Sequence, residues 1–276
     1  MIRSINDCTV LNNGIKMPWL GFGVFQTKEG QEVENAVKWA LETGYRSIDT
    51  AAIYGNERGV GNAMRQSGIP RAEIFLTTKV WNDDQRAKRT LAAFDESLKR
   101  LNTEYVDLYL IHWPVKGRYQ ETWKAMEEIY HSAKAKAIGV SNFLAHHLED
   151  ILADSTIVPT VNQVEFHPFL VQPELLKFCK AHKIQVEAWS PLMQGKVLAV
   201  PEVQKLAEKY HKTPTQIVLR WDVQHDVVTI PKSVHRDRIE ENIQIFDFEL
   251  SAEDMTTLDA LDAGQRVGPD PDNFNF

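Results

Sequence analysis

Short apolar runs recur along the chain and alternate with longer stretches in which apolar residues are spaced as in a helix. Each run is too short for a helix and is mostly β-branched or aromatic, which predicts a buried strand. The runs are Leu20–Val24, Arg46–Ile48, Ile74–Thr78, Val106–Ile111, Ala137–Val140, Thr160–Val164, Gln185–Trp189 and Val227–Ile230. The pattern therefore predicts eight strands.

The stretches between these runs predict helices. Val33, Val37 and Ala40 share one helical face, and Leu91 and Leu98 share another. Two helical patterns separate the last two strands, and two more follow the last strand. Eight strand–helix units in about 250 residues are typical of a (β/α)8 barrel. A doubly wound open sheet is the alternative, but it would need a glycine-rich phosphate loop to bind a dinucleotide.

The two ends of the chain predict elements outside the barrel. Thr9–Leu11 and Ile15–Met17 are β-like runs that flank the turn signal Asn12–Gly14, so we expect a hairpin that closes the bottom. The tail Gly268–Phe276 is irregular and is expected near the mouth. Because no linker or low-complexity segment divides the chain, we expect an α/β fold with one (β/α)8 TIM barrel domain over residues 1–276.

Charge and composition narrow the function classes. The chain has 31 lysines and arginines against 38 aspartates and glutamates, a net charge of −7. A nucleic-acid partner is not expected from this acidic balance, and any anionic ligand needs a local basic cluster. No apolar run approaches the roughly 18 residues of a membrane span, so no membrane partner is expected. The 2 cysteines form no disulfide framework, and the first residues lack a signal-peptide pattern, which favours a cytoplasmic location.

Polar side chains follow the expected strands at their carboxyl ends, where barrels of this kind place their active sites. They are Asp49 and Tyr54, Lys79, His112, Ser141 and Asn142, Gln163 and Glu165, Ser190, and Lys232 with Ser233. The opposite ends of the strands carry no comparable set. This distribution indicates an active face.

Four of these residues suit proton transfer to a carbonyl group. The pKa of a free tyrosine is near 10, and a lysine ammonium near Tyr54 lowers it by favouring the phenolate. An aspartate such as Asp49 can hold Lys79, and His112 can orient a substrate oxygen. Since the set contains no redox centre, electrons must come from a cofactor. Plain structural roles are the alternatives, with Asp49 as a helix N-cap and His112 as a core histidine.

Other common motifs are absent or incomplete. Gly21-Phe22-Gly23 and Gly59-Val60-Gly61 each lack the third glycine of G-x-G-x-x-G, so a Rossmann site is unsupported. Glu165 and His167 alternate on one strand and could share a metal ion, but we expect no metal. A basic cluster begins at Lys232 after the last strand, where helix N-terminal N–H groups favour anions. A solvated charged loop is the alternative interpretation of that cluster.

Six segments, in order along essentially the whole chain, resemble the aldo-keto reductases. They are Met17–Phe25, Gly44–Glu57, Val106–Pro114, Ile138–Phe143, Val161–Gln163, and Ile230–Ser233 continued by Arg238–Asn242. The segment Glu187–Leu192 and the short tail look most like the microbial branch, which includes glyoxal/methylglyoxal reductases and 2,5-diketo-gluconate reductases. One departure lies in Ser132–Lys136, where this chain has alanine and many relatives have glycine.

The resemblance implies a catalytic tetrad of Asp49, Tyr54, Lys79 and His112. Tyr54 would protonate the carbonyl oxygen, Lys79 would lower the pKa of Tyr54, and Asp49 would hold Lys79. His112 would orient the substrate.

The resemblance also implies NADPH/NADP+ as the cofactor. Ser141, Asn142 and Gln163 would bind the nicotinamide carboxamide, and Trp189 would stack on the ring. Lys232, Ser233 and Arg238 would bind the 2′-phosphate. The remaining implied cofactor contacts are Ser190, Leu192, Gln194, Gly195, Glu241 and Asn242, of which the last two would contact the adenine.

The implied substrate pocket is lined by Val24, Phe25, Trp81, His112 and Trp113. The expected activity is NADPH-dependent reduction of aldehydes and ketones, including small dicarbonyls, aromatic aldehydes and keto-sugars, to alcohols. The alternative is a non-catalytic NADPH-binding regulatory protein on the same fold. A monomer is expected.

Overall fold

The computed structural model describes residues 2–276, and within them eight parallel strands form one sheet. Each strand pairs with the next along the chain. The strands are β3 (Phe22–Gly23), β4 (Ser47–Asp49), β5 (Phe75–Val80), β6 (Val106–Ile111), β7 (Ala135–Ser141), β8 (Val161–Glu165), β9 (Gln185–Trp189) and β10 (Val228–Thr229). The eight predicted strands are therefore confirmed, with β6 and β9 matching their predicted bounds.

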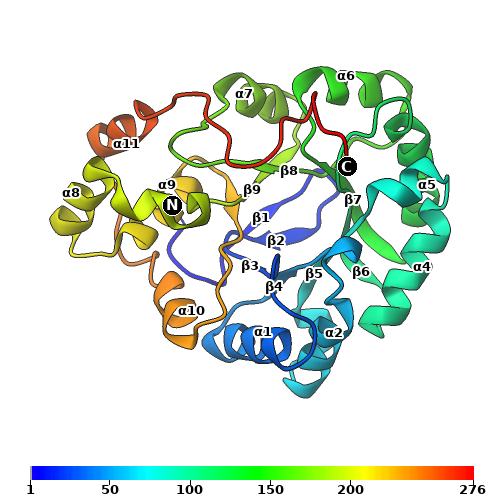
Figure 1. The fold of residues 1–276 in the computed structure, drawn as a ribbon, viewed down its shortest axis with the longest axis horizontal. Helices are drawn as coiled ribbons and strands as arrows, with labels where there is room; N and C mark the ends of the chain where they lie inside the picture. Colours follow the sequence, from blue (N-terminus) through cyan, green and yellow to red (C-terminus); the bar gives the residue numbers. More distant parts are fainter. Residues whose placement is uncertain (1) are drawn as a thin grey trace.

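Hydrogen bonds close the sheet into a barrel. The backbone N–H of Gly21 donates to the carbonyl oxygen of Thr229 at 2.9 Å, and the N–H of Thr229 donates to Trp19 at 3.1 Å. These bonds join the chain just before β3 to β10, so the first and last strands are neighbours in space (Figure 1). The (β/α)8 prediction is confirmed over the open-sheet alternative.

Helices surround the barrel, and all but α3, whose residues are polar, bury an apolar face in the main core (Figure 1). They are α1 (Gln31–Thr43), α2 (Glu57–Gln66), α3 (Asn82–Arg86), α4 (Thr90–Leu101), α5 (Tyr119–His131), α6 (Ala145–Asp154), α7 (Pro173–Ala181), α8 (Pro201–Tyr210), α9 (Pro214–Gln224), α10 (Arg236–Asn242) and α11 (Ala252–Asp259). None of these described helices combines the length and apolar character that crossing a bilayer would require.

The predicted N-terminal hairpin is confirmed and lies at the bottom of the barrel. Strands β1 (Cys8–Val10) and β2 (Lys16–Pro18) pair antiparallel. Leu11 and Met17 are buried with Leu108, Val161 and Val228 in a small apolar cluster at the lower end of the barrel interior. The hairpin therefore seals the amino ends of the strands.

The barrel interior is apolar at the bottom and polar at the top. On β5, Phe75, Thr77 and Lys79 share the interior face, since side chains two positions apart point to the same side. On β8 the same face carries Val161 and then Gln163. The polar end is the mouth, where the carboxyl ends of the strands meet.

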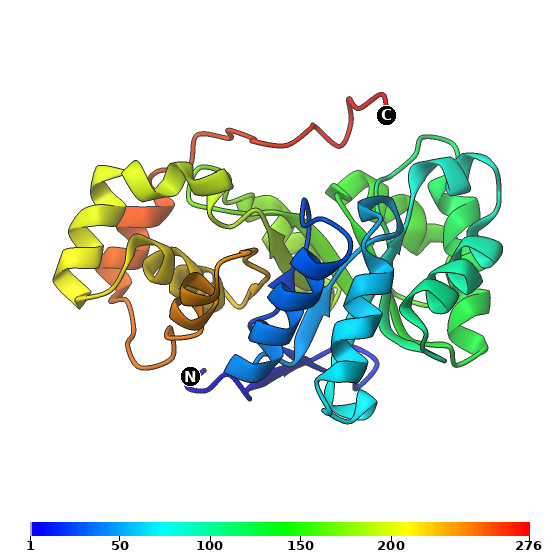
Figure 2. The ribbon, with the colours of Figure 1, turned by 60° about the horizontal axis from the view of Figure 1, so that its bottom comes forward.

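The tail beyond α11 crosses this mouth, as expected. Figure 2 shows it above the barrel, on the side opposite the hairpin. The Glu165 carboxylate at the end of β8 accepts the backbone N–H groups of Val267 at 2.6 Å and Gly268 at 3.2 Å. Asn82 and Arg86 donate to the backbone oxygen of Phe276 at 3.1 and 2.6 Å. The tail is thus held at both ends by side chains of the barrel rim.

Candidate active site

The structure brings the four predicted catalytic residues together at the mouth. Asp49 ends β4, Tyr54 ends the short 3-10 helix η1 (Ala52–Tyr54), Lys79 lies near the end of β5 and His112 follows β6. The Lys79 Nζ donates to Asp49 Oδ1 at 2.6 Å and to the Thr50 carbonyl at 3.0 Å. The same Nζ lies 5.2 Å from the centre of the Tyr54 ring, which is 5.6 Å from the His112 ring.

Burial and charge set the protonation states of this cluster. Burial is the largest influence on the pKa of Lys79 and lowers it, but the charge and hydrogen bond of Asp49 and the charges of Tyr54 and Glu187 together outweigh it, so the net pKa is raised and the ammonium persists. Burial raises the pKa of Tyr54 above 10, and the Lys79 charge opposes this without reversing it. Lys79 acts in the expected direction, but in this structure the net pKa of Tyr54 is raised rather than lowered. Tyr54 is therefore a protonated acid.

His112 is a neutral ring in this setting. Burial lowers its pKa well below 6.5, and the Lys79 charge acts in the same direction. Its Nδ1 is buried and has no hydrogen-bond partner among residues 2–276. A neutral imidazole can donate one hydrogen bond to an oxygen atom without bringing a second positive charge beside Lys79.

A second hydrogen-bond layer lies beneath the tetrad. The Nε2 of Gln163 donates to Asp49 Oδ2 and to Glu187 Oε2, both at 2.8 Å. Glu187 is fully buried on β9 and was missed as a site residue in the sequence. The signal that could have found it is its position two residues before Trp189, on the interior face of the strand.

The residues expected to bind nicotinamide lie together beside this layer. Ser141 Oγ donates to the Gln163 carbonyl at 2.7 Å, and Asn142 Nδ2 donates to the His112 carbonyl at 2.9 Å. The Trp189 Nε1 donates to Asn142 Oδ1 at 2.8 Å, which fixes the indole against the end of β7. Asn142 reaches these partners with a φ of 65°, a conformation that asparagine tolerates.

The loop after β9 holds the four further expected contacts, Ser190, Leu192, Gln194 and Gly195. It continues into η3 (Met193–Ala199), which Gln194 and Gly195 interrupt with φ values of 56° and 90°. Gln194 and Gly195 are exposed, while Ser190 and Leu192 are half-buried. The loop therefore offers an open, irregular backbone next to Trp189.

The basic cluster after β10 contains two cations that have no counter-ion in the described part of the chain. Lys232 and Arg238 are exposed and form no ion pair with residues 2–276, whereas Arg236 pairs with Glu240 at 2.8 Å. Ser233, which lies between Lys232 and Arg238 in the chain, is buried.

The two residues expected to contact the adenine are the last two residues of α10. Glu241 accepts a hydrogen bond from Thr213 Oγ1 at 2.8 Å, and Asn242 is buried at the end of α10. Both lie on the helix that carries Arg238, at the far end from Lys232.

Aromatic rings surround the mouth above the tetrad. Phe25 is 54% exposed and its ring centre lies 5.0 Å from that of Tyr54. Trp81 lies 5.1 Å from His112, and the Phe276 ring of the tail stacks on Trp81 at 5.8 Å. The two remaining pocket candidates are placed differently: Trp113 is buried against the tail rings Phe274 and Phe276, and the Val24 side chain is fully buried.

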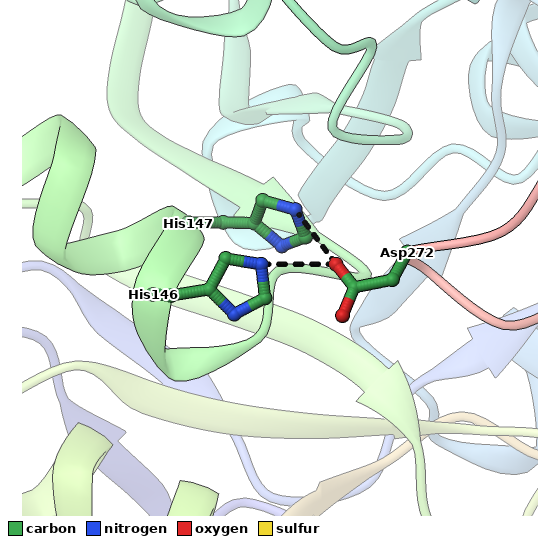
Figure 3. A group of neighbouring side chains, drawn as sticks. All are labelled: His146, His147 and Asp272. Atoms are coloured by element: carbon green, nitrogen blue, oxygen red, sulfur yellow. Dashed lines mark ion pairs between the residues drawn. The ribbon is translucent and has the colours of Figure 1, made fainter.

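A cluster of His146, His147 and Asp272 joins the tail to α6 (Figure 3). The two Nε2 atoms lie 2.9 and 3.3 Å from Asp272 Oδ1. His146 is exposed, whereas His147 packs beneath the tail and is 7% exposed. Its Nδ1 accepts the N–H of Leu144 at 3.2 Å, so the neutral ring carries its proton on Nε2, toward Asp272.

This proton position suits a hydrogen-bonded contact with the tail better than a metal site, because a metal-bound histidine donates through its other nitrogen. The second pair considered for metal, Glu165 and His167, is engaged elsewhere. His167 Nε2 lies 2.9 Å from Glu165 Oε1, and the same carboxylate holds the tail backbone.

Comparison with known proteins points to one family. The model of the aldo/keto reductase family matches residues 19–263. The chain is 56% identical to the glyoxal reductase of Bacillus subtilis (strain 168), with all of both chains covered. It is 47% identical to the methylglyoxal reductase DkgA of Escherichia coli (strain K12), covering 96% of each.

A solved structure of a Gox0644 mutant in complex with NADPH matches with a TM-score of 0.93 and 44% identity, covering 98% of this chain and 99% of that one. The family match over residues 19–263, the relatives and the shared fold agree with the segments that the sequence singled out. The chain belongs to the aldo/keto reductase family.

Proposed function

We propose that the protein reduces aldehydes and ketones to alcohols with NADPH, and that Tyr54 is the proton donor. The observation that carries this proposal is the buried Lys79–Asp49 pair beside the protonated Tyr54 and the neutral His112. When bound, NADPH supplies the hydride that adds to the carbonyl carbon.

The four side chains divide the proton chemistry among them. Tyr54 gives its hydroxyl proton to the carbonyl oxygen, and that proton ends on the alcohol. The Lys79 ammonium stabilises the phenolate left behind, since an opposite charge nearby favours the charged form. Asp49 and the Thr50 carbonyl hold the ammonium in place. His112 donates a hydrogen bond that orients the carbonyl oxygen.

Free polar groups around the mouth fit the dinucleotide. Both amide hydrogens of Gln163 are engaged, while its Oε1 accepts no hydrogen bond from residues 2–276 and is free for a carboxamide N–H. Lys232 and Arg238 carry unpaired charge that suits a 2′-phosphate. Ser141, Asn142 and Trp189 would complete the nicotinamide end, and the segments Ser190–Gly195 and Glu241–Asn242 would complete the rest.

The aromatic mouth favours small or flat carbonyl compounds. Phe25, Trp81 and the tail ring of Phe276 offer apolar faces around the tetrad. We propose small dicarbonyls first, then aromatic aldehydes and keto-sugars, because the relatives named above are a glyoxal reductase and a methylglyoxal reductase. We propose a cytoplasmic monomer in which residues 1–276 act as one domain.

The test is the loss of NADPH absorbance with methylglyoxal, phenylglyoxal, a nitrobenzaldehyde and 2,5-diketo-gluconate, with NADH in parallel. We expect turnover that prefers NADPH. Tight NADPH binding without turnover of any of these compounds would overturn the proposal in favour of a regulatory NADPH-binding protein.

A further inference from the structure

Glu187 is a carboxyl group inside the barrel that the reaction does not use directly. It lies in the middle of β9 and is fully buried. In an eight-stranded barrel β9 stands opposite β5, which carries Lys79, and β8 stands opposite β4, which carries Asp49 (Figure 1). Removing a carboxyl group from water costs free energy unless it is well partnered, so its partners are informative.

One residue connects the two sides of the barrel. The Nε2 of Gln163 donates one hydrogen to Asp49 Oδ2 across the interior and the other to Glu187 Oε2 on the adjacent strand, each at 2.8 Å. A primary amide has two N–H donors, and both are used here. The Gln163 amide therefore lies between two carboxyl oxygens.

Two carboxyl acceptors leave this amide only one orientation. If it were reversed, its oxygen would face the Asp49 carboxylate, which has no hydrogen to donate, and the hydrogen bond to Asp49 would be lost. In the observed orientation Oε1 accepts nothing from residues 2–276 and stays available to a donor. Asp49 alone could bind only one of the two hydrogens, which would leave the other unsatisfied in a buried site.

The protonation of Glu187 agrees with this role. Burial raises the pKa of Glu187 to about 8, the Asp49 charge adds to the rise, and the Gln163 hydrogen bond and Lys79 oppose it. A neutral Glu187 still offers its carboxyl oxygen to Gln163. It also leaves Asp49 as the single negative partner of Lys79.

We propose that Glu187 is a positioning residue that holds the Gln163 amide with its oxygen toward the carboxamide N–H of the nicotinamide. This inference rests on the proposed function, because it assigns a new residue to the same cofactor site. It makes Glu187 necessary for recognition of the carboxamide rather than for proton transfer.

The test compares NADPH with its 3-acetylpyridine analogue, in which a methyl group replaces the carboxamide NH2. The dissociation constants of both are measured by quenching of protein fluorescence. Because the analogue lacks the N–H that would donate to Gln163, it loses one hydrogen bond, and the wild type should bind NADPH about tenfold more tightly. Glu187→Gln keeps an acceptor oxygen for Gln163 and should keep the preference.

Glu187→Leu removes the acceptor and should erase the preference. The Kd for NADPH should rise about tenfold, while the Kd for the analogue stays at the wild-type value. Glu187→Met is a second apolar variant should Glu187→Leu not fold. Asp222→Asn alters another buried carboxyl, which accepts from Thr229 and lies outside this network, and should change neither constant.

Three results would overturn the inference. They are an unchanged preference for NADPH in the apolar variants, an equal weakening for both dinucleotides, and a lost preference in Glu187→Gln. A general loss of stability would weaken both dinucleotides together, so it cannot imitate the expected result. A wild type that binds neither dinucleotide would refute the proposed function itself, and the inference with it.

Discussion

Ala133, in the turn between α5 and β7, has a φ of 60°, where its Cβ is crowded by the backbone. We expect Ala133→Gly to raise the free energy of unfolding by about 0.5–1 kcal/mol, because glycine relieves the strain but adds freedom to the unfolded chain. Urea denaturation measures the change. Ala87→Gly, at a φ of −81°, is the matched control and should be destabilising. A less stable Ala133→Gly would contradict the strain argument.

Tyr54 is the residue on which the proposed chemistry depends. Tyr54→Phe removes the proton donor but keeps the ring, so kcat should fall by about 10²- to 10⁴-fold while the Kd for NADPH stays near the wild-type value. Steady-state rates and a binding titration measure the two effects. Tyr109→Phe removes a buried hydroxyl that has no hydrogen-bond partner among residues 2–276 and should leave both unchanged. Full activity in Tyr54→Phe would contradict the role of Tyr54 as the proton donor.

At the scale of elements, the loop after β10 and helix α10 test cofactor choice. Arg238→Ala removes an unpaired cation, so the KM for NADPH should rise by about tenfold and that for NADH should change little. Arg236→Ala is the control on the same helix, since Arg236 is already paired with Glu240. Equal effects of Arg238→Ala on both dinucleotides would contradict a phosphate-binding role.

The strands and their order were predictable because a buried strand requires a short run of apolar residues, and such runs are visible in the sequence. The polar residues that end them, such as Asp49 and Lys79, were predictable because the carboxyl ends of parallel strands meet at one end of a barrel. The hairpin followed from the turn residues Asn12–Gly14. These features depend on neighbours close in the chain or on strand order alone.

Other parts of the site depend on contacts that the chain pattern does not encode. Glu187 and Asp49 meet through Gln163 across the barrel, at sequence separations of 24 and 114 residues from it. His147 is buried against the rings of Tyr119 and Phe143 and against Asp272 of the tail. The raised pKa of Tyr54 depends on its burial. A linear pattern gives the type of these residues but neither their partners nor their surroundings.

At the scale of the whole molecule, buried histidines link stability to pH. Burial lowers the pKa of His147 to about 4, and an unfolded histidine binds a proton near pH 6.5. Between these values the unfolded chain binds more protons, so stability is lost as the pH falls. His112, whose pKa is also lowered by burial, acts in the same direction.

We expect the His147 contribution to lower the free energy of unfolding by about 2 kcal/mol between pH 7 and pH 5. His147→Asn keeps an acceptor for the Leu144 N–H but does not titrate, so denaturation at the two pH values should show a smaller difference. His131→Asn removes an exposed histidine and should keep the wild-type difference. If His147→Asn shows the same difference in the free energy of unfolding between the two pH values as the wild type, His147 is not its source.

The hairpin that seals the bottom of the barrel has a consequence for the order of events in a reaction cycle. With Leu11 and Met17 filling the lower end, both ligands of the proposed reaction must arrive and depart through the same mouth. A ligand that reaches Gln163 would lie deeper than a ligand held by Phe25 and Trp81, so we expect it to arrive first and depart last. Departure of the oxidised dinucleotide would then set an upper limit on how often one molecule can repeat the cycle.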